Sequence, residues 1–339
     1  MAVTTDRAYR QLLSASVAYR KPGIQELVYN SNPVIAAIRE RGNVRSYTGP
    51  EIRHHLQINK QDAQWFTGYD KLRNPPIELF NDAVFTPTNI AVPISFNGTE
   101  LLANQGRTRV INLMENYIDA AEGSMQDAME IAIHSDGTGS NGRQMIGLGA
   151  ALPIVDNTGT YGGINRATYS IWRTTTYDAD TDFPDIGTQV DSTTIRPMYE
   201  TIMAERSKGR RGADLLIASK EHYLAYSQSL VAHQRITSGG LMGRLGFTAL
   251  EFAGAGKQAE VVLASGIGTS MPANTTYGLE SESLYLYYHE DRNMDMLFDG
   301  DGAMPINQDA IANYLVWNGQ FVLGNPQYSW RLIDSDTAS

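Results

Sequence analysis

The sequence has 339 residues, 42% of them hydrophobic and 19% charged, a composition typical of a folded protein with one or two hydrophobic cores. The absence of cysteine excludes disulfides, cysteine-ligated metals and thiol catalysis. No stretch approaches the ~18 apolar residues of a membrane span, and the N-terminus MAVTTDRAYRQ lacks a signal core, so we expect a cytosolic product without membrane contacts. A net charge of −10 argues against nucleic-acid binding over the whole surface.

Positive charge is concentrated at the start of the chain. Residues 1–60 contain nine Lys and Arg against four Asp and Glu, whereas the remainder is acidic. This basic stretch leaves room for one anionic partner, and a solvated arm of mixed charge explains it equally well. Pro-Gly, Asn-Pro and Gly-Pro pairs interrupt its helical patterns, so we predict an extended arm with helical turns over residues 1–50. The basic contact candidates are Arg7, Arg10, Arg20 and Lys21.

Two stretches of strict alternation predict β-strands on either side of a long excursion. Hydrophobic side chains alternate over residues 52–58 and again over residues 90–96, where Pro93 favours the edge of a sheet. An isolated two-stranded hairpin is only marginally stable in water, so we expect this one to rest on something outside its own subunit. The alternative is a lid folded over the protein's own core. The contact candidates near the tip are Trp65, Phe66, Tyr69 and Lys71.

The strongest helical pattern follows the second strand. Apolar residues step by three and four positions from Val110 to Ala132, which predicts one long amphipathic helix. Asn97 or Thr99 can cap its start and Gly137 can end it, and a continuous helix between these points would be on the order of 57 Å long. We expect it to act as a spine against which a sheet packs.

Beyond residue 145 the sequence alternates between predicted strands and helices. A helix is expected from Thr194 to Ser207, and the buried strand ADLLIAS leads into a second helix after Ser219. Further strands are predicted for FTALEFA, AEVVLAS, SLYLYYH and YLVWNGQFVL. The fold class is therefore α+β, with a mixed sheet flanked by helices.

The string GTGSNG at residues 137–142 matches the G-x-G-x-x-G spacing of dinucleotide-binding loops. Such a loop must follow a strand and open a helix, so that the pyrophosphate meets a positive helix N-terminus. GTGSNG instead follows the longest predicted helix, where the helix dipole is negative. We interpret these glycines as a helix stop followed by a turn, and we predict no bound nucleotide.

Other catalytic and metal-binding patterns are also missing from the sequence. The acidic segment DADTDFPD has Phe183 where a calcium loop needs glycine. The histidines show no zinc-protease spacing, and no G-x-S-x-G motif is present. The basic cluster RSKGRRG at residues 206–212 favours a helix C-terminus over a nucleic-acid site. We therefore predict no enzyme activity, no metal and no cofactor.

Taken in order, these parts resemble the major capsid proteins of tailed bacteriophages, whose shell fold is shared with encapsulins and herpesviruses. The resemblance covers essentially the whole chain, and five stretches are similar to the family's: FTPTNIAVPISFNGTELL, IHSDGTGSNGRQMIGLGAALP, TYGGINRATYSIWR, TYGLESESLYLYYHEDRNM and AIANYLVWNGQFVLGNPQYSWRLI. The implied layout is an N-terminal arm at 1–50, an E-loop hairpin with its base strands at 51–96, a peripheral domain with the spine helix at 97–145, an axial domain at 146–285 and closing strands at 286–339.

The resemblance implies a capsid protein of the virion shell, assembled in the cytoplasm of a bacterial host. Its subunits would form hexamers and pentamers that close into an icosahedral head around double-stranded DNA, which they contact non-specifically. The E-loop would lie over a neighbouring subunit and bury its tip aromatics there. The basic arm would face other subunits, scaffold or DNA. Further implied partners are a portal protein, a separate scaffolding protein and a decoration protein.

Two features depart from some members of that family. Because the arm starts almost at Met1, we expect a separate scaffolding protein and no cleavage of a leading scaffold segment. The hairpin lysines Lys60 and Lys71 and the closing-strand asparagines Asn313 and Asn318 have no evident glutamate partner, so we expect no covalent crosslinks. Two other functions stay open at this point: an encapsulin-type shell around a protein cargo, and an α/β enzyme with a hairpin lid.

Overall fold

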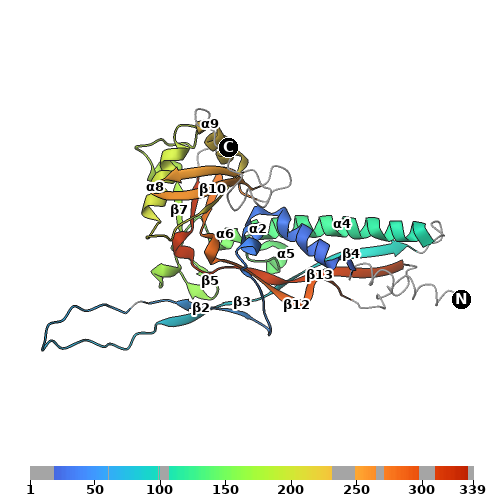
Figure 1. Ribbon diagram of the computed structural model, residues 1–339, viewed down its shortest axis with the longest axis horizontal. Helices are drawn as coiled ribbons and strands as arrows, with labels where there is room; N and C mark the ends of the chain where they lie inside the picture. The colour runs from blue at the N-terminus through green and yellow to red at the C-terminus, as the bar shows by residue number, and fades with distance from the viewer. Residues whose placement is uncertain are drawn as a thin grey trace.

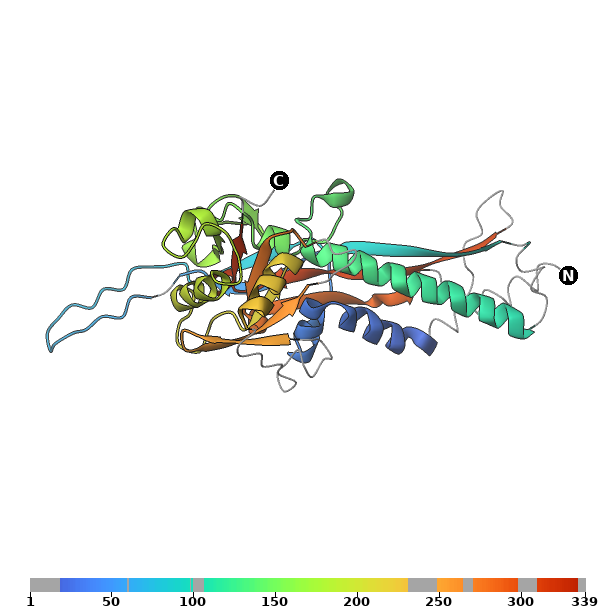
Figure 2. The ribbon, with the colours of Figure 1, turned by 90° about the horizontal axis from the view of Figure 1, so that it is seen from above.

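The computed structural model describes residues 19–59, 61–97, 99, 107–230, 249–264, 271–297 and 310–334. Over these residues the molecule is elongated (Figure 1; Figure 2). A long helix and a four-stranded sheet extend toward one end, and a β-hairpin projects from the other. A six-stranded sheet with its helices lies between them and to one side. We call these two parts the elongated half and the compact half.

The elongated half is one long helix packed on an open sheet. The helix α4 (Arg107–His134) has 28 residues, about 42 Å at 1.5 Å per residue. Its buried side chains include Ile118, Met125 and Met129, three positions of the apolar pattern seen in the sequence. The sheet order is β1 (Val44–Ser46), β12 (Leu284–Met296), β13 (Ala310–Leu323), β4 (Thr88–Asn97). β1 runs parallel to β12, and the other two pairs are antiparallel.

Two helices precede this sheet and pack along it. Residues 19–31 are helical, and Asn32 caps the next helix, α2 (Pro33–Glu40), by accepting hydrogen bonds from two N–H groups of its first turn. All side chains of residues 33–38 are buried. An extended arm with helical turns was expected here, whereas residues 19–40 form two packed helices. Asn32-Pro33 starts a helix instead of breaking one, because proline is favoured at the first helical position.

The compact half is a mixed six-stranded sheet with helices against it. Its strand order is β7 (Thr175–Asp178), β14 (Trp330–Ile333), β11 (Thr275–Leu279), β8 (Leu215–Ala218), β10 (Lys257–Leu263), β9 (Ala249–Gly254). Both faces of β8 are covered, which explains its uninterrupted apolar sequence. Leu215 and Ile217 pack into the core shared with α4, whereas Leu216 packs into a second core with α8 (Ile195–Glu205) and α9 (Lys220–Ser229).

Several short elements lie between the longer helices and strands that follow α4. They are α5 (Gly139–Gly142), α6 (Leu148–Ala151), β5 (Thr160–Tyr161), β6 (Ile164–Asn165), η1 (Ser170–Trp172), α7 (Ala179–Asp182), η2 (Ser281–Ser283) and η3 (Pro326–Tyr328). Gly137 has φ +85°, and Ser140 and Asn141 also adopt left-handed conformations, so the chain reverses directly after α4. The helix stop and turn predicted for GTGSNG are therefore confirmed.

The predicted helices and strands of the compact half are found close to their expected positions. The helix expected from Thr194 is α8, and Ser219 is the N-cap residue of α9. The predicted pairing of the hairpin is wrong. Residues 52–57 pair with residues 80–85, while residues 88–97 form β4 at the edge of the four-stranded sheet. The strand at 80–85 was missed because it contains Asn-Asp, a pair typical of turns.

Candidate assembly interface

A β-hairpin projects from the body of the molecule (Figure 1). β2 (Ile52–Gln57) and β3 (Phe80–Phe85) form its antiparallel root, and the segment between them extends away from both halves (Figure 1; Figure 2). The predicted alternation of β2 is confirmed, since Ile52 and Leu56 are buried while Arg53 and Gln57 are exposed. The root therefore belongs to the folded body, and the rest of the hairpin does not.

One side of the root is fixed by the β5–β6 turn. The Val84 N–H donates to the carbonyl oxygen of Gly162 at 2.9 Å. Gly162 has φ +58°, and a Cβ there would lie 2.7 Å from the Phe85 ring, so this approach requires glycine. Phe85 contacts Tyr161 edge-on with ring centroids 5.1 Å apart, and Tyr161 packs on Trp172 at 5.7 Å. This aromatic cluster sets the direction in which the hairpin leaves the body.

The other side of the root is fixed by β12. Nδ1 of His54 lies 3.1 Å from the hydroxyl of Tyr287, and the His54 ring packs on Tyr285 with centroids 4.9 Å apart. Burial, together with the nearby Arg45 guanidinium, lowers the pKa of His54 to about 4. The imidazole is therefore neutral near pH 7 and packs against Tyr285 and Tyr287 without burying a charge.

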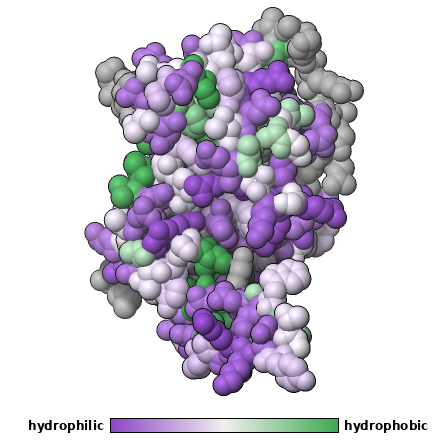
Figure 3. All heavy atoms as spheres, turned by 90° about the vertical axis from the view of Figure 1, so that its left-hand side faces the viewer, coloured by the Kyte–Doolittle hydropathy of each residue, from purple (hydrophilic) through white to green (hydrophobic). Residues whose placement is uncertain are grey.

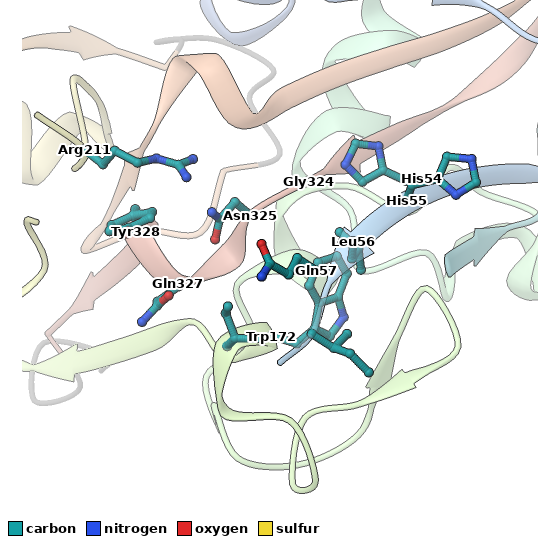
Figure 4. Close-up of a pocket in the computed structure, with 12 residues that line it drawn as sticks. His54, His55, Leu56, Gln57, Trp172, Arg211, Gly324, Asn325, Gln327 and Tyr328 are labelled. Atoms are coloured by element: carbon teal, nitrogen blue, oxygen red, sulfur yellow. The ribbon is translucent and has the colours of Figure 1, made fainter. Parts of the chain in front are cut away.

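A cavity of about 250 Å³ lies between the root and the compact half (Figure 4). The Gln57 side chain of β2 faces Asn325 across it (Figure 4). Arg211 stands at its far side and donates two hydrogen bonds to the Glu280 carboxylate, at 2.8 and 2.9 Å. Because this cation is already paired, the cavity is a gap beside a fixed root and offers no free charge to an anion.

The hairpin tip presents large side chains to solvent. Trp65 and Tyr69 are fully exposed, and Phe66 is 64% exposed. Lys71, the fourth tip candidate, is exposed on the returning arm. The tip stands away from both cores (Figure 1), so it is not a lid over its own chain. Exposed large apolar side chains of this kind mark interaction surfaces in soluble proteins.

Outside the hairpin, the described residues expose few large aliphatic side chains. Figure 3, which looks at the molecule from the hairpin side, shows hydrophobic side chains in small areas and no single broad patch on this face. Outside the hairpin, the most exposed aliphatic side chains of the described residues are Ile154 and Val155, each 60% exposed. They are neighbours in the loop that precedes β5.

The arm candidates that the structure describes are paired within the chain. Arg20 forms ion pairs with Asp119 at 2.5 Å and with Glu122 at 3.0 Å on α4. Lys21 forms an ion pair with Asp295 of β12 at 2.5 Å. These contacts hold helix 19–31 between the long helix and the sheet. The other two candidates, Arg7 and Arg10, lie outside the described residues.

Two further motifs noted in the sequence contribute side chains to contacts within the folded chain. Arg211 of the basic cluster is bound to Glu280, and Phe183 of the acidic segment is buried in the second core. Among the described residues there is no group of three His, Asp or Glu side chains placed to hold a metal ion. The described helices include none that is both long and apolar enough to cross a membrane.

The chain has the tailed-phage capsid fold: a long helix on an open sheet, a projecting hairpin, and a compact mixed sheet with helices. It is similar to the cyanophage A-1(L) capsid asymmetric unit, with 16% identity and a TM-score of 0.61 over 86% of this chain and 90% of that chain. For the capsid of an empty GTA particle the values are 12% and 0.52, over 88% of this chain and 89% of that chain.

The capsid of Myoviridae phage XM1 matches with 10% identity and a TM-score of 0.50, over 88% of this chain and 91% of that chain. No protein-family profile matches the sequence, and no curated protein does. Structural similarity at identities this low establishes the fold alone, and the shared fold confirms the resemblance seen in the sequence.

Proposed function

We propose that the chain is the major capsid protein of a tailed double-stranded DNA phage and assembles as hexamers and pentamers into an icosahedral head. The observation that carries the proposal is the hairpin. Its root is fixed to the body, and its aromatic tip is exposed and not packed against the described part of its own chain. The solved structures with this fold that are named above are capsids of phages and of a GTA particle, which supports a structural role over a catalytic one.

In this role, the hairpin that runs from β2 to β3 acts as the E-loop, and its distal part lies over a neighbouring subunit. Burial of each tip aromatic contributes roughly 1.5–3 kcal/mol. The fixed root reduces the conformational entropy lost on docking. Contacts of this size need not be individually tight, because a closed shell repeats them many times.

The other parts take corresponding roles. Residues 1–50 form the arm, residues 97–145 the peripheral domain with its spine helix, residues 146–285 the axial domain, and residues 286–339 the closing strands. The partners are other copies of the chain, a portal protein, a separate scaffolding protein, a decoration protein and packaged DNA held without sequence preference. The protein resides in the virion shell after assembly in the host cytoplasm.

Electron microscopy of the purified protein, produced with and without its upstream neighbouring gene, tests the proposal. We expect closed shells, tubes or hexameric rings, and a dependence on the neighbouring gene would identify the scaffold. Shells from infected cells should contain nuclease-protected DNA, whereas a protein cargo without DNA would favour a nanocompartment. A monomeric species of 37.3 kDa under both conditions would contradict the assembly role.

A further inference from the structure

The distal hairpin is not a continuous β-ladder. The last backbone hydrogen bond of the root joins the Ile58 N–H to the Leu79 carbonyl at 2.9 Å. Between that bond and the turn at residues 67–70, no backbone hydrogen bond joins the two arms among the described residues. The arms therefore expose backbone donors and acceptors as well as side chains.

A side-chain amide replaces the missing ladder. Gln64 Nε2 donates to the Arg73 carbonyl at 2.6 Å, and the Arg73 N–H donates to Gln64 Oε1 at 2.8 Å. Because a whole side chain lies between the arms, they stand further apart than the ~4.8 Å of a paired ladder. The result is an opening of about 590 Å³, whose apolar lining is Trp65, Pro75 and Ile77. We call this opening the hairpin window.

The loop before β5 presents a complementary shape. Ile154 and Val155 are adjacent and 60% exposed, and we call them the aliphatic knob. The loop backbone is held in place, since Thr176 donates to the Pro153 carbonyl at 2.7 Å and Thr158 donates to the Val155 carbonyl at 3.3 Å. The knob is therefore preformed, and its docking would order few additional groups.

The knob and the window cannot meet within one chain. The knob immediately precedes β5, which packs against the hairpin root, whereas the window lies in the part of the hairpin that extends away from the body (Figure 1; Figure 2). Contact therefore requires a second copy. A contact between two different surfaces of identical chains repeats head to tail and closes into a ring when the rotation allows.

Charges beside the two surfaces are also complementary. Asp156 directly follows the knob, and Lys71 and Arg73 lie on the returning arm of the hairpin. In the part of the chain that the structure describes, no ion pair involves any of these three side chains. Asp62 lines the window on the opposite arm, so Asp156 would favour the Lys71–Arg73 side.

We propose that the aliphatic knob of one copy inserts into the hairpin window of the next copy, with Asp156 facing Lys71 and Arg73. The inference rests on the proposed capsid function and identifies the surface that receives the hairpin.

Engineered disulfides can test this contact, because the chain has no cysteine of its own. Particles of the Ile77→Cys/Val155→Cys variant are oxidised mildly and analysed by non-reducing denaturing electrophoresis. We expect a covalent ladder that ends at five and six subunits. The matched control is Ile77→Cys/Leu224→Cys, whose second site is exposed on α9, and it should remain monomeric.

The outcomes separate this contact from the function itself. If the unaltered protein forms no shells, rings or tubes, the capsid role fails and the contact fails with it. Shells that give no ladder, or the same ladder from the control, would overturn the knob–window contact alone. A charge reversal tests the contact without a disulfide. Asp156→Lys should lower the yield of shells while monomer stability stays unchanged. Adding Arg73→Asp to this variant should restore the yield of shells. Loss without rescue contradicts the charge pairing.

Discussion

At the scale of single residues, two glycines have opposite roles. Gly278 lies in β11, and a Cβ there would be 2.1 Å from the buried Trp330 ring. Gly123 lies in α4, and a Cβ there would meet nothing within 4 Å. The first glycine allows a close approach between neighbouring strands, whereas the second only weakens a helix.

Alanine substitutions should therefore act in opposite directions. Gly278→Ala should lower the free energy of unfolding by on the order of 3 kcal/mol, because the Trp330 ring must shift in a packed core. Gly123→Ala should raise it by about 1 kcal/mol, because alanine favours the helix. Urea unfolding of the unassembled protein measures both. A Gly278→Ala variant as stable as the unaltered chain would contradict the packing described for β11, and a destabilised Gly123→Ala variant would contradict the open space at α4.

Two buried histidines make the monomer sensitive to acid. Burial lowers the pKa of His134 and of His222 to about 4, from an ordinary value of 6.5. Both ring nitrogens of His134 lack hydrogen-bond partners among the described residues, and its ring stacks on Tyr277. Below pH 6.5 the two histidines bind protons in the unfolded chain, whereas in the folded chain they stay neutral until about pH 4. The contribution of the two neutral histidines to the free energy of unfolding is therefore fully present above pH 6.5 and is lost as the pH falls from 6.5 to 4.

The expected loss is at most about 3 kcal/mol for each histidine over this range. Burial raises the pKa of Glu130, which acts in the opposite direction because the folded state then binds its proton more readily than the unfolded state. Comparing the unaltered chain with His134→Leu isolates the histidine. The free energy of unfolding of the variant should decline less between pH 6.5 and 4. Parallel curves for the two proteins would show that His134 does not titrate as described.

Among the elements, the basic arm combines a structural contact with a proposed DNA contact. Arg20 in helix 19–31 pairs with α4, whereas Arg7 and Arg10 are candidates for contacting DNA. Arg20 is bound to Asp119 and Glu122, and Glu122 is buried, so Arg20→Ala leaves a carboxylate without its cation. We expect this change to lower monomer stability by on the order of 1–3 kcal/mol. Arg7→Ala/Arg10→Ala should lower DNA retention in particles. If a variant with Arg7, Arg10 and Arg20 all changed to Ala still assembled and retained DNA, the proposal that the arm contacts DNA would be wrong.

Element types could be predicted from the sequence more readily than element partners. The stepping of apolar residues along α4 and the Ser219 cap of α9 are local signals, and both are confirmed. The pairing of β2 with residues 80–85 is not local, and the polar pair in that strand hid it. Helical turns were predicted within residues 19–40, but their packing against the sheet was missed for a similar reason. Proline at residue 33 can break or begin a helix, and the surrounding core decides which.

In the candidate interface, too, local features could be predicted from the sequence and contacts between distant residues could not. Exposed aromatics near its tip were predicted from composition and position, because an isolated hairpin cannot bury them. The window could not be predicted, since it depends on the Gln64 amide occupying the place of a backbone ladder. The root cluster around Gly162 was equally hidden, because its members lie far apart in sequence.

At the scale of the whole molecule, folding and assembly should be separable. Residues 61–77 have no part in either core, so replacing them with Asn-Gly should leave thermal unfolding of the monomer unchanged. The same deletion removes the tip aromatics and the window, and should abolish shells in electron micrographs. Tyr69→Phe serves as a conservative control that keeps the ring and should still assemble. If the trimmed chain still closed into shells, contacts other than the hairpin would drive assembly, and a fall in its unfolding temperature would mean that the hairpin stabilises its own chain.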